Sequence, residues 1–514
     1  MAVQKKTIFA VLVLFLTNVS AAQDSVEHNS QTEHFAAGYT FFSAVPVLQP
    51  FLHTSSYGKV EGYYNAENGN YIQAQDAPRK SIYGFYSEGT SKIKKYLVNG
   101  SFSYAKLKLD SVGYTLKYDP NDPSPYYLYA GKKGNWDIIK YNLKGNLSRS
   151  FSGDKLFTGL GIDYYTHDGW RINDPRPEHF KYRMLLNGAV NYRFLPDHYI
   201  GIQGGFTRGF SETQVNYQNE NYRNNIQAVD FVTHLEEAYG QQSVRDFIPA
   251  LTTRTDGSQW AGSYNSHTRW GNISLLIAYQ KKTSLFSEQA SAAQTGVQDY
   301  TYGTFFEDNW SGTLFWEYQN PRSAWHAKFD YFNNYGYDFN ETYAGNNYVY
   351  FRESAHIIAG YGHIKDGAVK YELDARGAVS YLFRATGSTG LRTACQFSTI
   401  GLSGAYYSKI QKAGLLKTKL LVNGYIPFSG EMKQPASQST ILSNVVYRDY
   451  YFFTSPSYLG SFYVTYSRKY RKLTPFIELL GSYQFANIKG GEIPAMELPG
   501  NNRSRIQLSL GCIL

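Results

Sequence analysis

The feature that most constrains this chain is a two-residue alternation of apolar and polar side chains over long runs. Within residues 181–194, Tyr182 and Val190 lie on one parity, whereas Arg183 and Asn191 lie on the other. Successive side chains of a strand point to opposite faces, so this segment predicts a strand with one apolar and one polar face. The run is longer than the roughly 5 or 6 residues that are usual for strands in water-soluble sheets.

The same alternation recurs in residues 139–148, 325–331, 367–384 and 416–426. A tilted strand needs roughly 9 to 11 residues to cross the hydrocarbon layer of a membrane. The pattern therefore predicts an all-β fold: a transmembrane, antiparallel, up-and-down β-barrel with roughly 14 to 18 strands, and 16 as the best estimate. A water-soluble β-sandwich is the alternative, but its strands would be shorter.

Composition narrows the class further. The chain has 48 Tyr, and aromatic residues make up 17% of it, which suits aromatic girdles at two membrane interfaces and equally a carbohydrate-binding β-protein. Two Cys exclude a disulfide-stapled scaffold. No stretch beyond the N-terminus has about 18 consecutive apolar residues, which excludes a helical membrane protein. The net charge of +9 is not gathered into dense basic runs, so no nucleic-acid partner is expected.

The N-terminus has the pattern of an export signal. Lys5 and Lys6 precede a short apolar run, and small residues follow it, so residues 1–22 are predicted to be a signal peptide. Residues 23–53 are then a partly disordered N-terminal segment, and residues 54–514 form the barrel. Export and barrel together predict the cell outer membrane of a Gram-negative bacterium, with outer-membrane lipid and the barrel-assembly machinery as partners.

Short turns alternate with longer polar segments, as expected for a barrel with short periplasmic turns and long extracellular loops. The longest polar segment is 213–266, which is rich in Asn, Gln, Glu and Arg and contains a predicted short helix around residues 227–239. We interpret it as a long extracellular loop that acts as a plug, a lid or a receptor surface. A plain solvated loop is the alternative.

The C-terminal strand, residues 506–514, alternates to its last residue, as in barrels that the assembly machinery recognises. With it, strands such as Val98–Tyr104, which have small residues in the middle and aromatics beyond, resemble the outer-membrane β-barrel proteins of Bacteroidota. The resemblance covers nearly the whole mature chain, although those proteins commonly end in an aromatic residue and this chain ends in Leu514. The subfamily is functionally uncharacterised, so the resemblance implies no catalytic or ligand-binding residue.

That phylum also uses a short O-glycosylation pattern. Asp24-Ser25-Val26 and Asp110-Ser111-Val112 match it, which makes Ser25 and Ser111 candidate acceptor residues. Matches of three residues also arise by chance. A plain turn is therefore the competing interpretation for Ser111.

No residue pattern points to catalysis. The 11 His are scattered, and none is tied by spacing to a nucleophile, so we predict no enzyme activity, no metal site and no cofactor. Charged residues on the polar strand faces are instead expected to line the lumen. They are Lys140, Lys144, Arg183, Arg193, His326, Lys328, Asp330, Lys370, Glu372, Asp374, Arg376 and Glu478. Charges of both signs can line a polar channel or pair and fill the barrel.

Three functions follow as hypotheses. The first is a passive or substrate-selective channel for a small polar solute, accessory to nutrient uptake. The second is a closed barrel that binds a surface ligand or has a structural role. The third is a hydrolase at the barrel rim. A TonB-dependent receptor is not expected, because strand alternation already begins near Ser55 and leaves no room for a folded plug domain.

Overall fold

The computed structural model describes residues 31–514, except 55, 118, 120–121, 223–225, 245–249, 289–299, 411–412, 436–438, 489, 492, 494 and 496. The predicted signal peptide and Ser25 lie outside the described residues. No helix of the described part is long and apolar enough to span a membrane.

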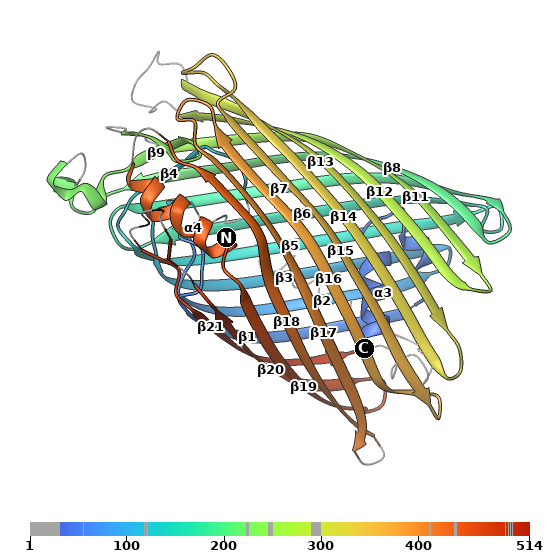
Figure 1. The fold of residues 1–514 in the computed structure, drawn as a ribbon. Coiled ribbons are helices and arrows are strands. Elements are labelled where there is room, and N and C mark those ends of the chain that lie inside the picture. Colours follow the sequence, from blue (N-terminus) through green and yellow to red (C-terminus); the bar gives the residue numbers. More distant parts are fainter. Residues whose placement is uncertain are drawn as a thin grey trace, which may run out of the picture.

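Eighteen long antiparallel strands form a single closed barrel (Figure 1). Closure occurs where β1 (Ser56–Gly69) pairs with both β2 (Arg79–Ile93) and the C-terminal β21 (Asn502–Ile513). The predicted all-β antiparallel barrel is confirmed, and the best estimate of 16 strands is wrong. The other barrel strands are β3 (Tyr96–Val112), β5 (Gly134–Phe151), β6 (Leu156–Arg171), β7 (Arg176–Leu195), β8 (His198–Asn216), β11 (Ala250–Thr268), β12 (Gly271–Glu288), β13 (Tyr300–Gln319), β14 (Ser323–Asn340), β15 (Tyr348–Lys365), β16 (Ala368–Thr386), β17 (Arg392–Ile410), β18 (Gly414–Lys433), β19 (Ser457–Arg468) and β20 (Thr474–Ala486).

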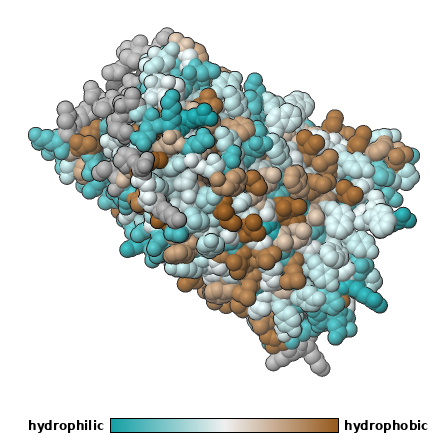
Figure 2. Space-filling view, viewed as in Figure 1, coloured by the Kyte–Doolittle hydropathy of each residue, from teal (hydrophilic) through white to brown (hydrophobic). Residues whose placement is uncertain are grey.

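The barrel has apolar side chains on its outer face and polar side chains on its inner face, the reverse of a water-soluble protein. On the outer face Leu402 and Leu420 are 66% and 68% exposed, whereas the inward Ser403 is 6% exposed. Figure 2 shows apolar side chains gathered between two more polar ends of the visible face. An apolar outer band around a polar interior is the arrangement of barrels that span membranes.

The two ends of the barrel differ in their connections. At one end the strands join through short turns, such as residues 152–155 and 366–367, where Gly153 and Asp366 adopt positive φ angles. The first barrel strand begins at this end, because Ser56 pairs with Ser91 just before the short turn at residues 94–95. The last barrel strand finishes beside it, since the N–H of Leu514 bonds to the carbonyl of Gly58. Longer connections gather at the opposite end.

The lumen at the short-turn end is occupied by residues 31–54, which we call the plug. Its helix α3 (Glu33–Ser43) begins after Thr32, whose hydroxyl accepts a hydrogen bond from the N–H of Phe35 and so caps the helix. The short helix η1 (Gln49–Phe51) follows. Figure 1 shows α3 inside the barrel. The predicted N-terminal segment 23–53 therefore contains an ordered part, the plug, whose apolar residues are buried against the wall, whereas residues 23–30 lie outside the described residues.

The predicted loop 213–266 is much shorter in the structure. Strand β8 continues to Asn216 and β11 starts at Ala250, so the connection is 217–249. The strand β11 is rich in Ser, Thr and Gly, and its outward side carries few apolar residues, which is why its alternation was hidden. The predicted helix around 227–239 is also wrong: a short helix η3 (Ile226–Phe231) is followed by the strand β9 (His234–Ala238).

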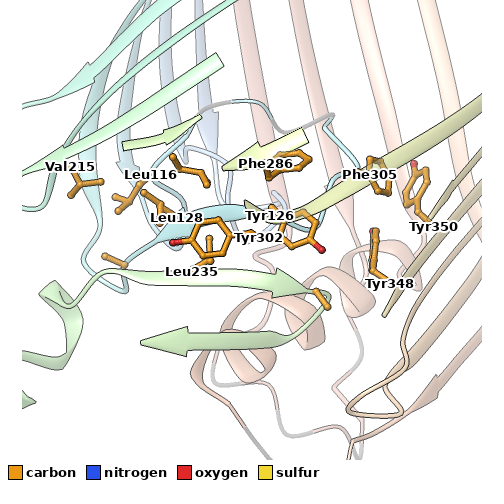
Figure 3. Close-up of a cluster of buried hydrophobic side chains, with 13 residues drawn as sticks. Leu116, Tyr126, Leu128, Val215, Leu235, Phe286, Tyr302, Phe305, Tyr348 and Tyr350 are labelled. Carbon is orange, nitrogen blue, oxygen red and sulfur yellow. The ribbon is translucent and has the colours of Figure 1, made fainter. Parts of the chain in front are cut away.

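Three connections cover the long-loop end, and we call them the cap: the described parts of residues 113–133, 217–249 and 439–456. The first two share a small sheet of β4 (Tyr127–Tyr129), β9 and β10 (Gln241–Val244). The third holds η4 (Leu442–Val446) and α4 (Tyr447–Phe453). An apolar cluster joins the first two to the barrel wall (Figure 3), with Leu116, Tyr126, Leu128 and Leu235 from the cap and Phe286, Phe305, Tyr348 and Tyr350 from the wall.

Candidate functional site: the lumen between plug and cap

The first turn of α3 is tied to the barrel wall by charge. Glu33 forms ion pairs of 2.8 Å with Lys417 and with Lys419 on β18. Burial alone would raise the pKa of Glu33, but the two lysines outweigh it and lower the pKa to about 2. The backbone N–H groups of Glu33 and His34 donate to the two carboxylate oxygens of Glu372 on β16, at 2.9 and 3.1 Å. A carboxylate at a helix N-terminus also complements the helix dipole.

A second attachment is centred on Glu317 of β13. Its carboxylate bonds to His53 and accepts a 3.1 Å hydrogen bond from Asn272. Burial lowers the pKa of His53, but the hydrogen bond and the charge of Glu317 outweigh burial and raise it. His34 lies 4.0 Å from Glu317 and packs against His326 of the wall, with ring centroids 5.6 Å apart.

The rest of the plug is held by neutral contacts on other sides of the lumen. Asn146 on β5 donates to the carbonyl of Ser43, and Asn191 on β7 donates to the carbonyl of Val47, both at 2.9 Å. Further around the wall, Phe315 of β13 packs against plug aromatics, one of them stacked at 5.1 Å. Because these strands surround the lumen, the plug obstructs it at the short-turn end.

Between the plug and the cap lies a cavity of about 550 Å³, which we call the chamber. Its wall comes from β6, β7, β8 and β11 to β14, and Asp119 and Asp122 of the cap lie at its boundary. A second cavity of about 280 Å³, under the cap, shares those two residues. Volumes of this order are typical of small-molecule sites, which usually measure roughly 300 to 1,000 Å³.

Four amide side chains form one row across the chamber wall. Gln259 pairs with Gln280, Gln280 with Asn309, and Asn309 with Asn334, on the adjacent strands β11 to β14. Residues paired directly across strands point to the same face of a sheet, and all four line the chamber. We call this set the amide row.

The charged side chains that line the chamber are already paired. There are six of them, three acidic and three basic, and each lies within hydrogen-bonding or ion-pairing distance of an opposite charge. The pairs are Lys181–Asp119 at 2.5 Å, Lys117–Asp122 at 2.9 Å, Arg183–Asp163 at 3.6 Å and Lys282–Glu307 at 3.9 Å. The chamber therefore presents mainly neutral hydrogen-bonding groups to a solute.

The predicted lumen residues lie on the inward parity of their strands but do not form one site. Glu372 holds α3, and Asp374 pairs with His326 at 3.7 Å beside the plug. Only Arg183 lines the chamber. The remaining members make local contacts or lie elsewhere on the wall: Lys144 with Asp163, Lys328 with Asp330, Arg376 with Ser403, Glu478 with Thr465, Arg193 near the turn at Gly153, and Lys140 and Lys370 on β5 and β16.

Ser111, the last residue but one of β3, has a positive φ of 59°, and its hydroxyl donates to Asp110. Its O-glycosylation stays a prediction. Within the described residues, no group of three or more His, Cys, Asp or Glu side chains could hold a metal ion.

Residues 46–514, which include every barrel strand, match the Family of unknown function (DUF6850). The chain belongs to this family. No curated protein matches this DUF6850 member.

Solved structures match it only at low similarity. They include the ferric preacinetobactin receptor BauA from Acinetobacter baumannii (9% identity, 89% of this chain and 80% of that chain, TM-score 0.37). The FrpB iron transporter from Neisseria meningitidis matches at 9% identity over 90% and 81% of the chains, with a TM-score of 0.38. The ferric-catecholate import receptor Fiu from E. coli K12 matches at 8% identity over 90% and 82%, with a TM-score of 0.41. Values this low carry no functional argument.

Neither the plug nor the amide row was predicted from the sequence. The plug had one usable signal, Thr32 and Glu33 before an aromatic-rich segment, which is a pattern of helix starts. The amide row had none, because Gln259 lay in a predicted loop and its neighbours are set by strand register.

Proposed function

We propose that this DUF6850 member is a substrate-selective channel of the outer membrane of a Gram-negative bacterium of the Bacteroidota type. The plug closes its inner mouth, and the cap restricts its outer mouth. The observation that carries the proposal is the chamber of about 550 Å³ between plug and cap, because a barrel with only a structural role gains nothing from a polar cavity in its lumen.

The size of the barrel supports a channel. Barrels of about 16 to 18 strands leave an aqueous passage unless other segments fill them, whereas those of about 8 strands are filled by their own side chains. Here the obstruction comes from one terminal segment and from loops. Removing residues 31–54 breaks no strand pairing of the barrel, since β1 begins at Ser56.

The orientation follows from the connections. Short turns face the periplasm and long loops face outward in outer-membrane barrels. The plug would then be accessible to periplasmic factors, and the cap to solutes outside the cell. Outer-membrane lipid and the barrel-assembly machinery are the expected partners, and the proposal requires no catalytic step and no cofactor.

Planar-bilayer conductance tests the proposal. The mature chain is compared with three variants. One lacks residues 31–54, one has residues 217–249 replaced by a short Gly/Ser linker, and one carries both changes. We expect small or intermittent current from the full chain and a steady open current from the chain without the plug. Silence from a chain that lacks both plug and cap loop, in protein shown to be folded, would rule out a channel.

A closed barrel that binds a surface ligand is the second candidate. The cap favours it, because its apolar cluster buries Leu128 and Leu235 almost completely and so makes a rigid outer surface. This function predicts silence in every conductance experiment and binding to a partner that is lost when residues 217–249 are replaced.

A further inference from the structure

We infer that the amide row is a binding site for a neutral, hydroxyl-rich solute of about disaccharide size. The inference rests on the proposed function and specifies what the channel carries. It is drawn from the geometry and charge of the chamber wall.

The row is a continuous hydrogen-bonding surface. Neighbouring strands lie about 4.8 Å apart, so four paired residues extend over roughly 14 Å. Each amide offers both a carbonyl acceptor and N–H donors. A hydroxyl group also donates and accepts, so a molecule with several hydroxyls can bond to successive amides without leaving either kind of group unpaired.

Two atoms of the row have no partner within the described part of the protein. They are Nδ2 of Asn309, a donor, and Oδ1 of Asn334, an acceptor. Both residues are only 9% exposed and line the chamber. Both atoms are themselves buried in this structure, so each amide has to turn toward the chamber before it can bond to a solute. A buried polar group without a partner costs about 1 to 3 kcal/mol, so a solute that then supplies an acceptor and a donor gains affinity.

The pairing of the chamber charges disfavours an ionic solute. A carboxylate or phosphate would have to compete with Asp119 for Lys181, with Glu307 for Lys282 or with Asp163 for Arg183. A cationic solute faces the same barrier at the acids. A neutral solute leaves these pairs intact.

Calorimetry on the full mature chain in detergent tests the inference, with maltose, lactose and lactobionate as probes. Lactobionate keeps most of the hydroxyls of lactose but carries a carboxylate, so it separates hydroxyl recognition from anion binding. We expect maltose or lactose to bind, and lactobionate to bind at least several-fold more weakly. Binding of lactobionate alone, or of none of the three, would overturn the inference.

Variants then locate the site. The double variant N309A/N334A should weaken saccharide binding about tenfold, since it removes two hydrogen-bonding groups. Asn333→Ala is the matched control, because Asn333 neighbours Asn334 on β14 but faces away from the lumen. Gln280→Ala, on a different strand, should weaken saccharide binding about threefold. It replaces the double variant in this test if the double variant does not fold. The inference would be overturned if a folded N309A/N334A or Gln280→Ala variant bound the saccharide as tightly as the N333A control.

The two proposals fail differently. If the chain without residues 31–54 conducts but maltose and lactose neither bind nor reduce the current, the channel stands and the saccharide site is wrong. If the sugars bind through the amide row but no variant conducts, the site stands and the channel is wrong.

Discussion

The plug and the cap close opposite ends of the same lumen in different ways. The plug is one terminal segment held by ion pairs, by single hydrogen bonds and by a small apolar cluster around Phe315. The cap consists of three internal connections, two of which share a β-sheet and a larger apolar cluster around Leu128 and Leu235. The plug can leave without unfolding a strand, whereas the cap cannot leave without breaking the apolar cluster that it shares with the barrel wall.

We therefore expect the gate of the proposed channel to lie at the plug end. Contacts made by charges are sensitive to pH and salt, and a single segment loses them together. A shared apolar core responds weakly to such conditions.

The largest effect is expected from Phe315→Ala, which removes the wall side of the plug's apolar cluster. Phe315 is 1% exposed and contacts both Phe41 and Phe42. The loss should weaken docking of the plug by about 4 kcal/mol. Hydrogen exchange of residues 33–51 measures it, and the neighbouring outward Leu314→Ala is the control. Unchanged protection would show that polar contacts alone hold the plug.

Leu235→Ala should loosen the cap without affecting the plug. Leu235 is fully buried and pairs with Leu128 across β9 and β4. We expect a loss of about 3 kcal/mol in local stability, read as faster proteolysis of residues 217–249. Val229→Ala, at an exposed position of η3, is the matched control. If the plug also becomes protease-sensitive, the two ends are coupled and the proposed asymmetry is wrong.

Acid should release the plug through Glu33. Its pKa falls from 4.5 to about 2 on docking, so its ion pairs stabilise the docked plug above pH 4.5 and lose that contribution as the pH falls toward 2. The contribution is at most about 3 kcal/mol. Glu33→Gln should dock weakly at every pH and show no such loss, whereas Glu341→Gln in an exposed loop should match the wild type. Channel opening measured from pH 6 to pH 3 distinguishes them.

The cap should respond to pH in the opposite direction, and slightly less. Burial raises the pKa of Asp449 from 3.8 to about 6, although its carboxylate accepts a 2.7 Å hydrogen bond from the N–H of Ala74. The cap is therefore most stable below pH 3.8 and loses up to about 3 kcal/mol as the pH rises through 6. Hydrogen exchange of residues 447–453 should show this loss. Asp449→Asn should abolish it, and Asp366→Asn, in a turn at the other end, should not.

The sequence by itself determined the class of fold. Alternation such as that of residues 181–194 is a local property, because each side chain's face is set by its own position in the strand. It was enough to predict an antiparallel barrel with apolar residues outside and Glu372, Asp374 and Arg183 inside. It failed at β11, where Ser, Thr and Gly give little contrast between the faces, and the strand count fell two short of 18 for that reason among others.

Only the tertiary structure decided what occupies the lumen. Glu33 lies 339 positions from the Glu372 that binds its N–H, and no local pattern connects them. The amide row depends on the register of β11 to β14, which brings Gln259, Gln280, Asn309 and Asn334 to one level. A shift of one residue in any of these strands would turn its amide toward the lipid. The sequence thus determines which face a residue takes, and the closed barrel decides which residues meet.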